Sequence, residues 1–235
     1  YSTTVSAMQP VFARSRTLVP MTQGAALGDS YAAAARPLLF VLVVGETARA
    51  DHFGINGYGR DTTPELARRG VMSWRNVRSC GTSTLASLPC MFSPLGKSGF
   101  ESCDADYENL LDVVQAAGLA VDDGILVDAF GRTSLPGIHA CGDCTRFPWG
   151  EGRLRLESVQ NAISQAECVA QTIKGQPVAY APKPWFWSDQ YDCKLQMAGL
   201  SAGSDVAVVR DPGIGPVQGV SVWYFRGQRL QAVEA

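Results

Sequence analysis

The sequence has no apolar run long enough to cross a membrane as a helix, which takes roughly 20 residues. Its strongest run covers residues 38–44, a length typical of a buried strand. It has no excess of either charge, since the formal net charge is −2. A chain without a basic field has no electrostatic footprint for nucleic acid, so we exclude that class of partner. We also find no secretory leader pattern, no internal repeat and no low-complexity tract.

What the chain does contain is enough apolar sequence for a core. Apolar residues make up 46% of its 235 residues and charged residues 18%, which is typical of globular rather than disordered proteins. Its seven cysteines point in two directions. Cys80 and Cys90 lie in a segment typical of oxidised proteins, whereas Cys141 and Cys144 lie in one typical of reduced proteins. This conflict over redox compartment is a first indication of two origins.

The front half is predicted to alternate strand and helix. Residues 1–36 are rich in Ser, Thr and Ala without a clear period, and we expect a linker there. Residues 38–44 show no polar alternation, which is typical of a central parallel strand covered on both faces. The strand runs into Glu46, and active groups gather at the carboxyl ends of such strands. Helices are predicted over 61–69, with Pro near the first position, and over 107–117, with one apolar face.

The pattern changes after residue 121. Residues 124–128 and 137–143 are predicted to be strands, and the second ends in a Gly-Asp turn. A long helix follows over 154–174 and is closed by Gly175. The remainder is aromatic and rich in strand formers. Strands are predicted there at 185–187, 205–210 and 220–225.

Glu46 and Thr84 are the candidate reactive residues of the front half. A threonine hydroxyl is a poor nucleophile unless its pKa is lowered, and a zinc ion held by a carboxylate can lower it. Cys80 and Cys90 flank Thr84, and a disulfide between them would fix its loop and stabilise the fold by roughly 2–3 kcal/mol. On residue type alone, the commoner interpretation is a surface acid and a turn threonine.

Several motifs of this half occur together in one enzyme family. They are Val43–Phe53, Arg60–Leu66, Ser79–Thr84 and Leu88–Ser93. Over residues 30–121 the sequence resembles the phosphoethanolamine transferases that modify lipid A, which are zinc-dependent enzymes of the alkaline-phosphatase/sulfatase type. The resemblance implies Glu46 as a zinc ligand, Thr84 as the nucleophile and a metal contact, and a disulfide between Cys80 and Cys90. It also implies phosphatidylethanolamine and lipid A as substrates, and the periplasmic side of the inner membrane as the location.

The zinc site that this resemblance implies is expected to be incomplete. The family's other ligands, an Asp-His pair, and its further substrate-binding histidines lie far downstream of the nucleophile and have no counterpart here. The chain has two histidines, His52 and His139, and His52 belongs to the Glu46 motif. Two ligands do not make a four-coordinate site.

Asp143 is the candidate binding residue of the back half. A strand ending in Gly-Asp lets the backbone approach a ligand closely, and the carboxylate accepts hydrogen bonds from hydroxyls, which suits the ribityl chain of a flavin. A helix that starts near Arg155 could face the flavin's pyrimidine edge with its positive end. Trp187 offers a flat apolar surface for the ring.

The back half resembles a second family. The matching stretches are Gly124–Asp128, Arg132–Ser134, Gly142–Cys144, Glu157–Ala166 and Pro184–Tyr191. Over residues 118–235 the sequence resembles the FAD-dependent ferredoxin reductases of the rubredoxin and putidaredoxin type. The resemblance implies that Asp143, Glu157 and Trp187 contact FAD, that NAD(P)H donates electrons, and that a ferredoxin-like carrier accepts them in the cytoplasm.

The dinucleotide-binding turn of that family, G-x-G-x-x-G, has no match in the chain. Residues 213–219 come nearest, but they have one residue too many and a proline where a helix should start. Cys141 and Cys144 form a C-x-x-C pair, for which we expect no redox or metal role because flavin contact already explains the Gly-Asp between them.

The predicted fold class is α/β. A partial alkaline-phosphatase/sulfatase-like α/β/α half precedes the end of an FAD-binding domain and a small α+β reductase C-terminal domain. The predicted boundaries are a linker at 1–36, a transferase-like part at 37–121, the end of the FAD-binding domain at 122–182 and the reductase C-terminal domain at 183–235. The join falls within Ala117–Val121, which resembles both families, so we hypothesise a chimera.

The function predicted from these motifs is a fusion of two incomplete enzymes that is inactive as it stands. Two alternatives stay open: a residual FAD-binding oxidoreductase module in residues 118–235, and a residual zinc phospho-transferase that uses Thr84. A non-enzyme alternative is an electron-transfer docking module made of residues 183–235.

Overall fold

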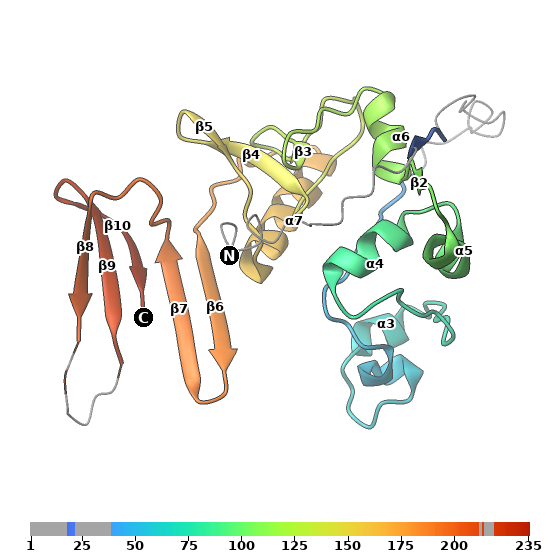
Figure 1. The fold of residues 1–235 in the computed structure, drawn as a ribbon, viewed down its shortest axis with the longest axis horizontal. Helices are drawn as coiled ribbons and strands as arrows, with labels where there is room; N and C mark the ends of the chain where they lie inside the picture. Colours follow the sequence, from blue (N-terminus) through green and yellow to red (C-terminus); the bar gives the residue numbers. More distant parts are fainter. Residues whose placement is uncertain (1–17, 22–38, 212, 214–218) are drawn as a thin grey trace. The chain divides into compact units, whose positions relative to one another are not determined.

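The computed structural model describes residues 18–21, 39–211, 213 and 219–235 (Figure 1). The chain separates into two compact units, Tyr1–Val114 and Gln115–Ala235, which are described in turn. Each unit contains helices and strands, which confirms the predicted α/β class. The predicted linker lies outside the described residues except for 18–21. No helix in the described part of the chain is long and apolar enough to span a membrane.

Short helices dominate the first unit. In chain order its elements are β1 (Leu18–Val19), the 3-10 helices η1 (Ala50–His52) and η2 (Gly54–Asn56), α3 (Pro64–Arg68), α4 (Thr84–Met91), α5 (Gly96–Ser102), β2 (Asp106–Tyr107) and α6 (Leu110–Ala116), whose last two residues belong to the second unit. Its strands β1 and β2 pair in parallel.

Two of these helices were predicted from their end signals. Helix α3 starts at Pro64, where the missing N–H costs nothing, and the left-handed Gly70 follows it. Helix α6 begins at Leu110 rather than at Tyr107, because Asp106 and Tyr107 pair with β1. The Asn109 side chain then accepts the Leu111 N–H at 2.8 Å and sets the later start.

The strand predicted over residues 38–44 is not formed. Leu38 lies outside the described residues, and residues 39–44 have no regular structure. Their side chains are exposed, with Phe40 at 78% and Val43 at 81%. An apolar central strand needs a paired strand on each edge, and in the described residues no strand pairs with this segment. The prediction was therefore right about composition and wrong about structure.

The second unit begins with a small sheet packed on one long helix. Strand β3 (Ile125–Leu126) pairs in parallel with β4 (Thr145–Trp149), which pairs with antiparallel β5 (Gly152–Leu154). Helix α7 (Val159–Ile173) follows. The buried apolar residues of this part are Leu119, Val127, Phe147, Cys168 and Val169.

Two boundaries in this part differ from prediction. The strand expected at 137–143 is replaced by turns, because Gly137 and Gly142 have φ values of +77° and +86° that break an extended run. The strand comes later, as β4. Helix α7 starts at Val159 rather than at 154, since 152–154 pair with β4. Its predicted stop at Gly175, which has a φ of +77°, is confirmed.

A five-stranded antiparallel sheet ends the chain (Figure 1). Its strands are β6 (Trp185–Gln190), β7 (Cys193–Gly199), β8 (Val206–Arg210), β9 (Ser221–Arg226) and β10 (Arg229–Glu234), and their order across the sheet is β6-β7-β10-β9-β8. The predicted strands at 185–187, 205–210 and 220–225 correspond to β6, β8 and β9. Gly199 allows β7 to approach β10, because a Cβ there would lie 2.1 Å from the Gln231 carbonyl oxygen.

Candidate functional sites in the two units

Glu46 and Thr84 lie together although 38 positions separate them in sequence. The Thr84 hydroxyl donates to Glu46 Oε2 at 3.2 Å, and the Thr47 hydroxyl donates to Glu46 Oε1 at 2.5 Å. Thr84 is the first residue of α4, and its neighbour Ser83 caps that helix by accepting the Ala86 N–H. All three members of the Thr47–Glu46–Thr84 set are exposed. The sequence motifs thus point to two side chains that the fold does bring into contact.

A disulfide joins Cys80 to Cys90, whose Cα atoms are 6.3 Å apart. Cys90 lies in α4 and is buried, so the bond ties the loop before the helix to the helix itself. The enclosed loop contains Thr84. Lys97 of α5 donates to the Ser79 carbonyl oxygen at 3.1 Å and holds the loop from the other side. The position of Thr84 is therefore fixed by a covalent link and by the helix that it starts.

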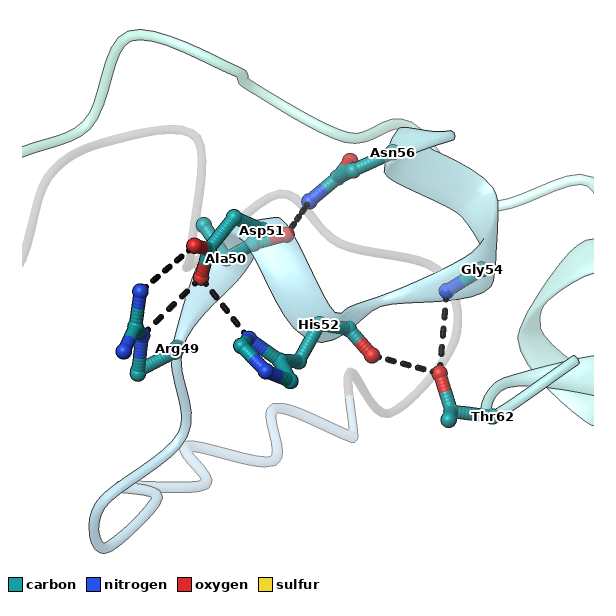
Figure 2. A network of polar contacts seen from close by, with 7 residues as sticks. All are labelled: Arg49, Ala50, Asp51, His52, Gly54, Asn56 and Thr62. Carbon is teal, nitrogen blue, oxygen red and sulfur yellow. Dashed lines mark hydrogen bonds and ion pairs between the residues drawn. The ribbon is translucent and has the colours of Figure 1, made fainter. Parts of the chain in front are cut away.

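The chain that follows Glu46 is folded by a polar network (Figure 2). Arg49 donates to both carboxylate oxygens of Asp51, at 3.1 and 2.6 Å, and His52 Nδ1 lies 3.0 Å from Asp51 Oδ1. These hydrogen bonds, with Arg49 as the largest cause, hold the pKa of Asp51 down to about 2. Thr62 donates to the His52 carbonyl oxygen at 2.6 Å and accepts the Gly54 N–H at 3.0 Å.

Asp51 and His52, the Asp-His pair of the Glu46 motif, are both hydrogen-bonded within this network. The His52 ring also packs on Tyr58, with ring centroids 4.7 Å apart. Asp51 and His52 therefore stabilise the turns η1 and η2, and no described contact joins them to Glu46. The network was missed at the sequence level, although the close spacing of Arg49, Asp51 and His52 was a usable signal.

A zinc site needs more donor atoms than Glu46 and Thr84 provide. Glu46 and Thr84 offer two oxygen atoms, and across the described ranges no group of three or more His, Cys, Asp or Glu side chains could hold a metal ion. A structural or catalytic zinc site takes at least three protein ligands. The residues in the described part of the chain do not fit a complete zinc centre, and we derive no reaction step through zinc.

The Gly142–Asp143 turn is the clearest feature of the second unit's candidate site. Gly142 is buried, and its N–H donates to Gln165 Oε1 of α7 at 2.7 Å. The Thr145 hydroxyl lies 2.8 Å from both the Gly142 carbonyl oxygen and Gln165 Oε1. Asp143 stands at the exposed tip between these anchors. A Cβ on Gly142 would lie 3.7 Å from Ala162, so the turn packs directly on the first turns of α7.

Glu157 lies just before the N-terminus of α7. Its carboxylate pairs with Arg155, which also lies 3.4 Å from Asp123. Ser158 caps the helix by accepting the Asn161 N–H at 3.2 Å. Glu157 is therefore part of an ion-pair chain that ties the start of β3 to the start of α7.

Trp187 lies on β6 and stacks on Trp185, with ring centroids 5.0 Å apart and planes inclined by 29°. Trp187 is 37% exposed. Trp185 lines a hollow of about 410 Å³ beside α7, together with Asn161 and Tyr180. Trp187 and Asp143 are not among the residues that line it, and no described contact joins Trp187 to Asp143 or to Glu157.

The Gly142–Asp143 turn and the start of α7 have the shape and charge that a flavin requires. The exposed Asp143 residue can accept hydrogen bonds from a hydroxyl-bearing chain. The positive N-terminal end of the capped helix α7 suits the electron-rich edge of a ring. Asp143 and the start of α7 thus fit a flavin, whereas the contacts do not bring Trp187 to them. Desolvation is the largest cause that raises the pKa of Cys141 and of Cys144, which favours the thiol over the thiolate in both residues.

Comparison with known families gives different matches for the front and the back of the chain. The family described as Sulfatase matches residues 39–122, the Pyridine nucleotide-disulphide oxidoreductase family matches residues 106–166, and the Reductase C-terminal family matches residues 185–235. The chain joins parts of two enzyme families. We call residues 39–122 the sulfatase-like segment and residues 106–235 the reductase-like segment, and the two overlap over residues 106–122.

Individual relatives divide in the same way. Rhodocoxin reductase from Rhodococcus erythropolis is 46% identical over 130 residues, which are 53% of this chain and 29% of the relative. Putidaredoxin reductase CamA from Pseudomonas putida is 42% identical over 125 residues, 52% of this chain and 29% of the relative. Phosphatidylethanolamine transferase Mcr-1 from Escherichia coli is 53% identical over 88 residues, 37% of this chain and 16% of the relative. The chain thus spans less than a third of each relative.

Two solved structures are similar to the reductase-like segment. A ferredoxin reductase from Rhodopseudomonas palustris is 40% identical with a TM-score of 0.48, over 56% of this chain and 34% of that one. The covalent putidaredoxin reductase–putidaredoxin complex is 40% identical with a TM-score of 0.48, over 56% of this chain and 32% of that one.

Proposed function

We propose that the chain is a fusion of two incomplete enzymes that completes neither reaction unaided, and that its retained capacity is flavin binding by the reductase-like segment. The supporting observation is the Gly142–Asp143 turn, which buried hydrogen bonds to Gln165 and Thr145 hold on α7. The matched reductase families use FAD as an electron carrier. When bound, FAD would supply the two-electron chemistry.

Each candidate residue has a distinct task in this proposal. Asp143 accepts hydrogen bonds from flavin hydroxyls, because its carboxylate is exposed at the tip of a fixed turn. The N-terminus of α7 presents its positive end to the pyrimidine edge. Glu157 orients Arg155 beside that end. Trp187 is the candidate for covering one face of the ring system, because its indole is an exposed flat apolar surface on β6.

The test is a titration of the purified full chain with FAD, followed by flavin fluorescence. We expect binding, and we expect Asp143→Ala to weaken it about tenfold or more, since a hydrogen bond to a charged group contributes roughly 1.5–3 kcal/mol. Asp189→Ala removes an exposed carboxylate on β6 and should leave the affinity unchanged. A wild-type chain that binds no FAD would overturn the proposal.

The contact between Thr84 and Glu46 favours a second candidate, phospho-group transfer to Thr84. In that reaction Thr84 Oγ bonds to the phosphorus of phosphatidylethanolamine, and diacylglycerol leaves with the hydroxyl proton. Intact-mass measurement after incubation with phosphatidylethanolamine and added zinc tests it. A mass gain that is absent in Thr84→Ala supports this candidate, as does bound zinc that is lost in Glu46→Ala. An unchanged mass removes it.

Partners and location follow from the two segments. We propose a ferredoxin-like electron carrier for the reductase-like segment, because relatives are named as ferredoxin reductases and one solved relative is a complex with putidaredoxin. The Cys80–Cys90 disulfide favours an oxidising compartment such as the periplasm for the sulfatase-like segment. The reductase-like segment, with its free Cys141 and Cys144, favours the cytoplasm.

A further inference from the structure

Gln165 is a buried polar residue in the middle of helix α7. Its side chain is 1% exposed, and it shares its helix face with the buried Cys168 and Val169. Burying an amide costs free energy unless hydrogen bonds replace those it made with water. A leucine of similar size would fill the same volume without that cost. Packing therefore does not explain a glutamine here.

In the described part of the chain, the side-chain oxygen of Gln165 binds one turn. Its Oε1 accepts the Gly142 N–H at 2.7 Å, and the Thr145 hydroxyl lies 2.8 Å from the same oxygen. Thr145 is fully buried, and its own N–H donates to the Gly142 carbonyl oxygen at 3.0 Å. The turn between Gly142 and Thr145 is thus closed on itself and fastened to α7 by one amide oxygen.

The hydrogen bond between Gly142 and Gln165 sets the backbone direction at Asp143. Gly142 has a φ of +86°, and its N–H points into the protein to meet Gln165. Asp143, the next residue, is exposed. If the Gly142 peptide lost its partner, a glycine could rotate at little cost, and the direction of Asp143 would change with it.

We infer that Gln165 is a positioning residue, which fixes the Gly142 peptide and thereby aims the Asp143 carboxylate at a flavin hydroxyl. This inference rests on the proposed flavin binding. Gln165 does not touch the ligand in this inference, since its side chain is 1% exposed and lies beneath the turn.

The experiment compares three variants of the full chain. Gln165→Leu keeps the volume and removes the acceptor. Gln165→Glu keeps an acceptor oxygen for the Gly142 N–H. Gln171→Leu makes the same change at a half-buried position of the same helix and serves as the control. Amide hydrogen exchange of Gly142 is measured by NMR in each chain without flavin, beside that of α7 amides such as Val169. FAD affinity is then measured by fluorescence.

We expect Gln165→Leu to raise Gly142 exchange and the FAD dissociation constant about tenfold each, a factor that corresponds to about 1.4 kcal/mol. Exchange of the α7 amides should stay unchanged. Gln165→Glu should retain most of the protection and affinity, and Gln171→Leu should match the wild type. A Gln165→Leu chain with wild-type exchange and affinity overturns the inference.

Two other outcomes also decide the matter. If Gln165→Leu loses Gly142 and α7 protection together, Gln165 supports the fold as a whole and the positioning role is overturned. If the wild type binds no FAD, the flavin proposal is wrong, and so is the claim that Gln165 orients Asp143 toward a flavin. The exchange data in that case still show whether Gln165 fixes the Gly142 peptide, so the two failures are distinguishable.

Discussion

Tyr180 shows how burial changes the chemistry of one residue in the second unit. Its hydroxyl donates to Asn161 Oδ1 at 2.6 Å, and its ring meets Phe147 edge-on at 5.2 Å. Burial is the largest cause that raises the pKa of Tyr180 to about 12. A neutral hydroxyl is therefore part of the folded structure well above the pH at which an exposed tyrosine ionises.

The raised pKa predicts a pH-dependent loss of stability. Because the folded pKa lies above the unfolded value of about 10, the stabilising contribution of Tyr180 is complete below pH 10 and disappears as the pH rises through about 12. Urea unfolding between pH 8 and 12 should show this decline in the wild type and a smaller one in Tyr180→Phe. Tyr191→Phe, at a fully exposed tyrosine, should behave as the wild type. Equal declines in all three chains would contradict the prediction.

Some site residues were predictable from sequence and others were not. Glu46, Thr84 and Asp143 stand in short motifs, so their local pattern was enough to name them as candidates, and their functional roles stay predictions. Gln165 was missed because a glutamine in an amphipathic helix looks like a surface residue. Its burial depends on a turn some 20 positions earlier in the chain, and no local pattern encodes that contact.

At the scale of elements, the close approach of β7 to β10 depends on Gly199. Gly199 has a φ of +84°, and an added Cβ would lie 2.1 Å from the Gln231 carbonyl oxygen. Gly203 has nearly the same φ, +83°, with nothing within 4 Å of the added Cβ. The two glycines thus share backbone strain and differ in available space.

This pair predicts two different costs of substitution by alanine. Gly203→Ala should destabilise the chain by about 1 kcal/mol, the strain of a left-handed alanine. Gly199→Ala adds a clash with backbone and should cost at least ~3 kcal/mol or disrupt the pairing of β7 with β10. Urea unfolding followed by tryptophan fluorescence measures both. Equal costs would show that the strands can separate without penalty.

Elements were predictable where their partners are close in sequence. Strands β6 and β9 pair with antiparallel neighbours that follow after two residues, and β8 pairs with β9, which follows after ten. Residues 39–44 have an equally apolar composition but no paired strand in the described part of the chain. Strand composition is local, whereas a parallel strand gains its hydrogen bonds from distant segments.

At the scale of the molecule, each unit exposes apolar surface that folded domains normally cover. Residues 39–44 are exposed in the first unit, and in the second all five residues of β8 are exposed at an edge of its sheet. An apolar strand with one open edge is a template for pairing with another chain.

We therefore expect the purified protein to self-associate at micromolar concentration. Light scattering after size-exclusion chromatography should report species larger than one chain of 25.1 kDa. Val209→Lys places a charge on β8 and should shift the protein toward the monomer. Val178→Lys, at a comparably exposed loop position, should have a smaller effect. A monomer with a sharp, reversible melt would contradict this expectation.

The end of α6 has a practical consequence for dividing this protein. The helix stops at Ala116, the Gly118 N–H donates to the Gln115 carbonyl oxygen at 2.9 Å, and Gly118 has a φ of +104°. The next residue, Leu119, is 5% exposed and already belongs to the core of the second unit. A cut at Gly118 would keep α6 in one piece, although its last two residues belong to the second unit, and would leave Leu119 in that unit's core. A cut two residues later would remove this anchoring side chain. Gly118 is therefore the position at which we would divide the chain to express the two halves separately or to fuse either half to another protein.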